Sequence, residues 1–409
     1  MAELSEFEAS LAAELAELRR EGRWHPLTVL EGPQDAEVEI GGKRYINLCS
    51  NNYLGLNTHP RLIEAAIEAT KKWGAGSGAV RTIAGTQSLH EELEARLAQF
   101  KGTPAALTLQ SGFTANLAVL GATLAEGDAV VSDELNHASI IDGIRLTKAR
   151  RYLFPHKDLD GLAQRLEEAR RDGARRILVV TDGVFSMDGD IAPLPEIVAL
   201  AEAQGAAVMV DDAHASGVLG RNGRGSVDHF QLEGRVAIQV GTLSKAVGVL
   251  GGYAAGSQDL RDILIHSARP FLFSTSHPPA VVAACLAAIE VMEEEPELQV
   301  RLWDNARYFK AGLTELGFDT GASETPITPV IVGEAERAVA LSSELRQRGV
   351  FATAIGFPTV ARDRGRVRTI VTAAHTRAQL DRALSAFAEA GLALGLGLSP
   401  APGAQPRGV

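Results

Sequence analysis

The stretch ILVVTDGVFSMDGDIAPLPEIVALAEAQGAAVMVDDAH, residues 177–214, indicates the fold class. It begins and ends with short apolar runs rich in β-branched residues, Ile177–Thr181 and Ala207–Asp211, and a helical pattern over Leu194–Gln204 lies between them. An apolar run without alternation is typical of a strand that is covered on both faces. A strand, a helix and a second strand in this order predict parallel strands joined by a crossover helix.

The same alternation continues on both sides of this stretch. Further strands are expected over Ala105–Leu109, Ala129–Ser132 and Val236–Val240. Helices are expected over Arg61–Trp73, Ala115–Leu124, Ser139–Thr147 and Leu159–Arg171, and a capping box of Ser88 with Glu91 predicts the start of another. We therefore predict an α/β protein whose central sheet is mostly parallel and flanked by helices.

The chain divides into four expected segments. Residues 1–60 are predicted to form an N-terminal arm and a short hairpin, and residues 61–290 the large α/β domain. A smaller α+β C-terminal domain is expected over residues 291–395, after a long helix from Pro279 to Glu295. The last residues, 396–409, are rich in Gly and Pro and predict a disordered tail.

Composition excludes several classes of protein. The chain has 409 residues, of which 45% are hydrophobic and 22% charged, and this is ordinary for a globular protein. A net charge of −11 argues against a nucleic-acid-binding protein. No secretory signal and no membrane-spanning run are visible, and the two cysteines, Cys49 and Cys285, are too few for a disulfide framework or a thiolate metal site. We expect a soluble cytoplasmic protein without a metal or a membrane partner.

Polar side chains follow five of the predicted strands. In chain order they are Ser111, which precedes Gly112, then His137, then Asp182 and Ser186, then Asp211 and His214, and finally Thr242 and Lys245. In open α/β sheets, ligands bind beyond the carboxyl ends of the strands. The five groups therefore predict one site at this edge of the sheet.

The residue types at this edge suit one cofactor, pyridoxal 5′-phosphate. Ser111 and Gly112 precede a helix, whose N-terminus attracts a phosphate. A carboxylate at a strand end, Asp211, can hold a pyridine nitrogen protonated, and Lys245 can form a Schiff base with an aldehyde.

Three more residues complete this predicted cofactor site. Thr242 offers a further hydroxyl, and His137 can stack on the ring. His214, three residues beyond Asp211, can reach the ring oxygen.

These motifs resemble the α-oxoamine synthases, a family of fold-type I pyridoxal-phosphate enzymes that includes glycine C-acetyltransferase and 8-amino-7-oxononanoate synthase. The resemblance covers most of the chain. It rests on Ser50-Asn51-Asn52-Tyr53-Leu54-Gly55, Gly74-Ala75-Gly76-Ser77-Gly78, Asn136-His137-Ala138-Ser139, Phe185-Ser186-Met187-Asp188-Gly189, Asp211-Asp212-Ala213-His214, Thr242-Leu243-Ser244-Lys245, Phe273-Ser274-Thr275-Ser276, Arg366-Val367-Arg368 and Ala374-His375-Thr376.

The resemblance implies roles for individual residues. Lys245, Asp211 and His137 would be catalytic, and Phe113 and Ser186 would line the cofactor with the residues already named. The remaining implied site residues are Asn51 and Arg368, for the carboxylate of the amino acid, and Ser274 and Thr275, for the phosphate in the neighbouring subunit. A homodimer with shared active sites is therefore implied.

The family condenses a small amino acid with an acyl-CoA. We expect glycine and acetyl-CoA to give 2-amino-3-oxobutanoate and CoA. The alternative is 8-amino-7-oxononanoate synthase, the decarboxylative condensation of L-alanine with pimeloyl-CoA or its carrier-protein thioester in biotin biosynthesis, or an enzyme that accepts both pairs. The motifs do not separate these substrates.

Other interpretations stay open for particular residues. Asp212 is an alternative to Asp211 as the functional carboxylate, Asn51 also suits a turn, and Arg366 is interpreted as a bystander beside Arg368. Residues 74–79 match a dinucleotide-binding pattern but follow a predicted helix, so we interpret them as a loop near the substrate. A non-catalytic regulatory module is the alternative class, and the presence of Lys245 argues against it.

Overall fold

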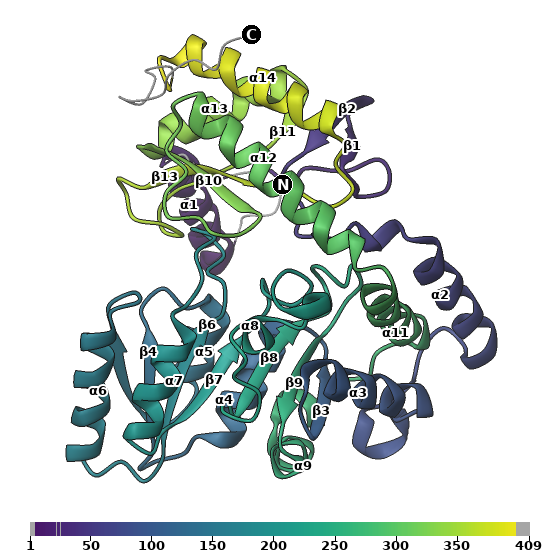
Figure 1. Ribbon diagram of the computed structural model, residues 1–409, viewed down its shortest axis with the longest axis vertical. Helices are drawn as coiled ribbons and strands as arrows, with labels where there is room; N and C mark the ends of the chain where they lie inside the picture. The colour runs from purple at the N-terminus through teal and green to yellow at the C-terminus, as the bar shows by residue number, and fades with distance from the viewer. Residues whose placement is uncertain (1–4, 22, 25, 398–409) are drawn as a thin grey trace.

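Figure 1 shows a computed structural model of the chain, which describes residues 5–21, 23–24 and 26–397. Two bodies are stacked along the long axis of the molecule, with the large sheet in the lower body and the small sheets in the upper body. The predicted disorder of the tail falls largely on residues 398–409, which lie outside the described residues.

The lower body is built on a seven-stranded sheet with the order β3-β9-β8-β7-β6-β4-β5. The strands are β3 Ala105–Leu109, β4 Ala129–Asp133, β5 Arg150–Phe154, β6 Ile177–Asp182, β7 Ala207–Asp211, β8 Ile238–Thr242 and β9 Gly252–Gly256. Strand β9 runs antiparallel to both of its neighbours, and the pairs among β4 to β8 are parallel. The predicted, mostly parallel sheet with flanking helices is therefore confirmed.

Apolar side chains cover both faces of this sheet. In β6, Ile177 and Val179 pack in one cluster with α6 (Leu159–Arg171) and α7 (Leu194–Ala203). Leu178 and Val180 pack in another cluster with α4 (Gly112–Thr123) and α5 (Ala138–Arg145). Because successive side chains of a strand point to opposite faces, an unbroken apolar run is what a strand between two helical layers requires. This packing explains why β6 reads as a continuous hydrophobic segment.

The helices of the lower body match most of the predicted ranges. They are α2 Pro60–Trp73, α3 Ser88–Lys101, α4 Gly112–Thr123, α5 Ala138–Arg145, α6 Leu159–Arg171, α7 Leu194–Ala203, α8 Ser226–His229, α9 Gln258–Ser267, α10 Arg269–Leu272 and α11 Pro279–Glu294, with short turns η1 Leu56–Thr58, η2 Arg81–Gly85 and η3 Arg221–Gly223. The predicted N-cap of α3 is wrong by one residue. Gln87 caps this helix, because its backbone N–H donates to the side chain of His90.

In the large sheet, two strands were not expected from the sequence, and one is displaced. Strand β8 begins two residues later than predicted, so Thr242 is its last residue. Strand β5 is an edge strand with exposed arginines, and β9 consists of Gly, Ala and Tyr. Neither segment has the alternating β-branched pattern that predicts a strand. Strand β5 lies at the edge of the sheet, and the small residues of β9 allow close packing.

The upper body gathers both ends of the chain. It contains α1 Glu6–Arg20, α12 Glu297–Glu315, α13 Ala335–Gln347 and α14 Arg377–Leu394. Its two small sheets are made of β1 Glu37–Ile40, β2 Lys43–Asn47 and β11 Val350–Phe351, and of β10 Ile327–Gly333, β12 Thr353–Ile355 and β13 Gly365–Ile370. The hairpin β1–β2 pairs in parallel with β11, so the N-terminal hairpin is part of the C-terminal body.

The division into four segments stays a prediction. Among the helices of the described residues, none is both long and apolar enough to cross a bilayer.

A buried ion pair joins helix α3 to the end of strand β7. The ammonium of Lys101 lies 2.8 Å from Asp212, and both side chains are fully buried. Asp212 also accepts hydrogen bonds from the backbone and the hydroxyl of Ser226. The carboxylate of Asp212 therefore binds Lys101 and Ser226 behind the end of β7, and Asp211 is the carboxylate that faces the site.

A second charged cluster lies at the ends of β4 and β5. His156 contacts Asp133 at 3.1 Å and Asp190 at 2.9 Å. Burial alone would lower the pKa of His156, but its hydrogen bonds with the two carboxylates outweigh that effect and raise the pKa to about 9. The cluster ties the loop before His137 to the segment that carries Ser186.

We predict that Lys101→Met destabilises the protein by about 3 kcal/mol, because it leaves a carboxylate buried without its cation. Urea-induced unfolding followed by circular dichroism measures this change. Lys71→Met is the matched control, since Lys71 pairs with Glu68 at the exposed surface and its loss should change the unfolding free energy very little. Equal effects of the two variants would contradict the prediction.

We predict that His156 stabilises the protein in a pH-dependent manner. Its pKa is raised above the ordinary value of 6.5 to about 9, so its contribution is complete below about pH 6.5 and is lost as the pH rises through 9. Unfolding free energies of the wild type and His156→Gln, measured across this range, should converge at the alkaline end. His229→Gln, which alters an exposed histidine, is the control. A constant difference would show that the charge of His156 plays no part.

Candidate active site

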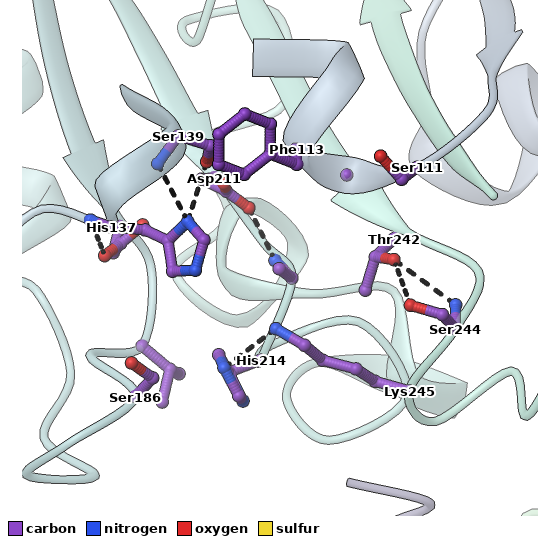
Figure 2. Close-up of a pocket in the computed structure, with 14 residues that line it drawn as sticks. Ser111, Phe113, His137, Ser139, Ser186, Asp211, His214, Thr242, Ser244 and Lys245 are labelled. Carbon is purple, nitrogen blue, oxygen red and sulfur yellow. Dashed lines mark hydrogen bonds between the residues drawn. The ribbon is translucent and has the colours of Figure 1, made fainter. Parts of the chain in front are cut away.

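A cavity of about 220 Å³ lies beyond the carboxyl ends of β3, β4, β6, β7 and β8 (Figure 2). It is lined by Ser111, Gly112, Phe113, His137, Ser139, Asp182, Val184, Ser186, Asp211, Ala213, His214, Thr242, Ser244 and Lys245. The structure therefore brings together the nine residues that were expected to surround a cofactor from one subunit. The first and last of them, Ser111 and Lys245, are more than 130 positions apart in the chain, and the strands place all nine at one edge of the sheet.

One end of the cavity is formed by the N-terminus of helix α4. Ser111 is the N-cap, and its hydroxyl accepts from the backbone N–H of Thr114 at 3.0 Å. A Cβ at Gly112 would lie 3.1 Å from Cβ of Thr242, and a Cβ at Gly252 would lie 2.3 Å from the carbonyl oxygen of Ser111. The strands and the helix N-terminus approach this closely because glycine occupies both positions, and the free N–H groups of the first turn then face the cavity.

Asp211 lies at the opposite end, buried at the last position of β7. One of its oxygens accepts from the backbone N–H of Ala213 at 2.8 Å, and the other accepts from the side-chain amide of Asn116 at 2.6 Å. Among the described residues, no Lys, Arg or His forms an ion pair with this carboxylate. A buried carboxylate without a cation is costly, so this end of the cavity favours a ligand that presents a charged N–H.

The ring of His137 lies beside Phe113 and Asp211 (Figure 2). Its Nδ1 accepts from the backbone N–H of Ser139 at 3.2 Å, and its own backbone N–H donates to Asp182 at 2.9 Å. Burial lowers the pKa of His137, and the charge of Asp211 opposes this shift. A neutral ring held at its backbone and at Nδ1 offers a flat face to a planar ligand.

Lys245 extends into the cavity from the loop after β8, and its ammonium nitrogen lies 2.8 Å from Nε2 of His214. Burial lowers the pKa of Lys245 to about 8, although the charges of Asp211 and Asp182 oppose that effect. A useful fraction of the amine is therefore uncharged near neutral pH. An uncharged amine in a partly apolar pocket is a nucleophile for a carbonyl carbon.

Asn51 and Arg368 meet next to the cavity without lining it. Arg368, on β13, donates to the carbonyl of Ser186 at 2.9 Å, and its Nη2 lies 3.4 Å from Oδ1 of Asn51. The two residues are 317 positions apart in the chain. They stand where a guanidinium and an amide can meet a carboxylate that is attached near Lys245.

The interpretation of Arg366 as a surface bystander is wrong. Arg366 is buried, and its guanidinium donates to the carbonyl of Met187 and to Asp188. The two arginines of β13 thus hold consecutive carbonyls of the segment that carries Ser186. The guanidinium of Arg366 contacts residues of that segment, and Arg366 therefore holds the segment in position.

Ser274 and Thr275 do not line the cavity of their own chain. Thr275 forms a β-bridge with Val80, and its carbonyl accepts from Gln110 at 2.9 Å. A role for this pair in the same subunit's site is therefore not supported by the geometry. The predicted contact with a neighbouring subunit stays a prediction.

Three residues at the site were given no role from the sequence, although Asp182 was noted at the end of its strand. Asp182 is buried, and burial together with the charge of Asp211 raises its pKa well above the ordinary value. Its place at the end of β6 was a usable signal. Asn116 lies four residues after Gly112, one helical turn further on, and its contact with Asp211 appears only once α4 has packed on the sheet. Ser139 was likewise recognisable only through its place as the second residue of α5.

These features define an enzyme of the fold-type I pyridoxal-phosphate class. The buried carboxylate without a cation fits the pyridine nitrogen, the glycine-lined helix N-terminus fits the phosphate, and the amine of Lys245 lies between them. A family model for aminotransferases of class I and II matches residues 43–387, and the chain belongs to this family and, within it, to the α-oxoamine synthases.

Several known proteins are similar to the chain over nearly its whole length. The 8-amino-7-oxononanoate synthase of Symbiobacterium thermophilum is 62% identical over 387 residues, which cover 94% of this chain and 98% of the relative. The 8-amino-7-oxononanoate synthase 1 of Bacillus subtilis is 58% identical over 374 residues, or 91% and 95% of the two chains. A solved structure of serine palmitoyltransferase with pyridoxal phosphate has a TM-score of 0.90 at 35% identity and covers 97% of this chain and all of its own.

We predict that Gly252→Ala weakens cofactor binding by roughly tenfold, because the added methyl group would push the Ser111–Gly112 turn away from β9. Equilibrium titration of the cofactor-free protein with pyridoxal phosphate measures the affinity. Gly121→Ala is the matched control. Gly121 lies in α4, the helix that begins at Gly112, and an added Cβ at Gly121 meets nothing within 4 Å. Unchanged affinity in Gly252→Ala, with a normal circular dichroism spectrum, would contradict this account of the phosphate end.

Proposed function

We propose that this enzyme is an 8-amino-7-oxononanoate synthase, which joins L-alanine to a pimeloyl thioester and releases carbon dioxide and the thiol. The observation that carries the proposal is the identity of 62% to a relative of this name across 94% of the chain. The expectation of glycine and acetyl-CoA is not supported by the relatives, which favour the alternative pair.

Each end of the site has a task in this reaction. Arg368 and Asn51 bind the carboxylate of alanine through a guanidinium fork and an amide, and so fix the amino acid beside Lys245. When bound, pyridoxal phosphate supplies an electron sink for the α-carbon of the amino acid. Asp211 keeps a positive charge on the ring nitrogen, because a buried carboxylate stabilises a cation at hydrogen-bond distance.

Lys245 is the proposed proton carrier. Its pKa of about 8 means that the free amine is accessible near neutral pH and can take the α-proton of alanine. His137 would lie against the ring of the bound cofactor and, held neutral by burial, can exchange a proton at Nε2. Ser186, whose carbonyl is held by Arg368, lines the same side of the cavity.

The proposed assembly is a homodimer. Ile83 and Phe273 are 83% and 70% exposed in one chain, and they flank the bridge between Val80 and Thr275. Large apolar side chains with this exposure suit a protein partner. A second copy seated on this surface would bring Ser274 and Thr275 to the phosphate end of the neighbouring site.

We predict that the enzyme releases thiol faster from pimeloyl-CoA with L-alanine than from acetyl-CoA with glycine. A thiol-reactive dye measures both rates under the same conditions. Lys245→Ala should lose the activity and the yellow colour of the bound cofactor, whereas Lys72→Ala, which alters an exposed lysine on α2, should keep both. Faster turnover of glycine with acetyl-CoA would restore the other member of the family as the better assignment.

A further inference from the structure

Tyr53 is linked to Lys245 through a histidine. The hydroxyl of Tyr53 lies 2.7 Å from Nδ1 of His214, and Nε2 of the same ring lies 2.8 Å from the amine of Lys245. Tyr53 is 0% exposed, and it comes from the loop between β2 and η1. Figure 2 shows the contact between His214 and Lys245 at the floor of the cavity. The two nitrogens of one imidazole therefore face two different groups.

The proton of the Tyr53 hydroxyl has one available acceptor. Among the described residues, Nδ1 of His214 is the only hydrogen-bond partner of this hydroxyl. Tyr53 packs in a core cluster with Leu54 and Ala215, and the charged group that acts on it, Arg368, is a hydrogen-bond donor that cannot accept the proton. If Nδ1 carried a hydrogen, it would donate to the tyrosine oxygen, and the hydroxyl proton would be buried without an acceptor.

Three ionisation states support the same direction of hydrogen bonding. Burial lowers the pKa of His214 well below its usual range, and the charges of Lys245 and Arg368 add to this effect, so the ring is neutral. Burial raises the pKa of Tyr53, so its hydroxyl keeps its proton. The lowered pKa of Lys245, about 8, makes its uncharged amine available as an acceptor.

We propose that Tyr53 is a positioning residue that sets the tautomer of His214. Its hydroxyl donates to Nδ1, which keeps the hydrogen of the neutral imidazole on Nε2 and directs that N–H at the amine of residue 245. Toward the cofactor, the same N–H is the donor for the ring oxygen that His214 is expected to contact. The proposal rests on the cofactor site proposed above and is independent of the choice between alanine and glycine.

The charged groups around Lys245 determine the pH at which the tautomer of His214 should be measured. Lys245 also faces Asp211, Asp182 and Arg368, and its ammonium form would donate to Nε2 and so oppose the proposed tautomer. The tautomer is therefore to be read about one pH unit above the pKa of Lys245, where the amine is mostly uncharged. At that pH the remaining determinant of the tautomer is the contact at Nδ1.

Nitrogen NMR on the cofactor-free protein, labelled with ¹⁵N-histidine, measures the tautomer directly. The signal of His214 is assigned by its loss in His214→Gln. We expect the wild type to show a hydrogen on Nε2, and Tyr53→Phe to lose this preference. Tyr253→Phe is the matched control, because Tyr253 is equally buried but its hydroxyl contacts Ser216 at 2.7 Å.

A hydrogen on Nδ1 in the wild type overturns the proposal even if Tyr53→Phe fails to fold. The same tautomer in the wild type and in folded Tyr53→Phe overturns it as well. Neither measurement uses a substrate, so a wrong choice of substrates for the enzyme leaves both results unaffected.

Cofactor-loaded protein gives a second reading. A donor to the ring oxygen stabilises its negative charge, so loss of that donor should raise the midpoint of the pH-dependent absorbance of the bound cofactor. We expect a rise of about one pH unit in Tyr53→Phe, the size of one weakened hydrogen bond to a charged group. No shift is expected in Tyr253→Phe. Equal midpoints in the wild type and Tyr53→Phe would show that Tyr53 serves only to pack the core.

Discussion

The site depends on one electrostatic constraint, the burial of the Asp211 carboxylate without a cation from the described residues. Such a charge is costly unless a bound group supplies a positive N–H. The backbone N–H of Ala213 and the amide of Asn116 hold the carboxylate in place but carry no net charge. The fold thus keeps a negative charge for the ring nitrogen of the cofactor, and the lowered pKa of Lys245 provides an amine that can react at the other end.

A layer of buried contacts behind the cavity keeps these groups in place. Lys101 neutralises Asp212, the immediate neighbour of Asp211, so that two adjacent carboxylates take different roles. Arg366 and Arg368 hold the segment that carries Ser186 against β13. These contacts join the upper and lower bodies beside the cavity, whose lining residues all come from the lower body.

Much of the fold was predictable because parallel strands between helices have an unbroken apolar pattern, as in β6 and β7. The pattern was absent from β9, where glycine and alanine allow the Ser111 turn to approach, and from the charged edge strand β5. Arg366 was misinterpreted for a related reason. An arginine in a strand gives no sign that a carbonyl 179 positions away will accept its hydrogen bond.

The sequence by itself determined the chemistry of the site, because the residue types at the five strand ends, from Ser111 to Lys245, are set locally by strand and turn signals. Only the tertiary structure decided which groups touch. The contacts of Asn116 with Asp211, of Asn51 with Arg368 and of Tyr53 with His214 join residues 95 to 317 positions apart. Their protonation depends on burial and on the charges around them, and these exist only once the chain has packed.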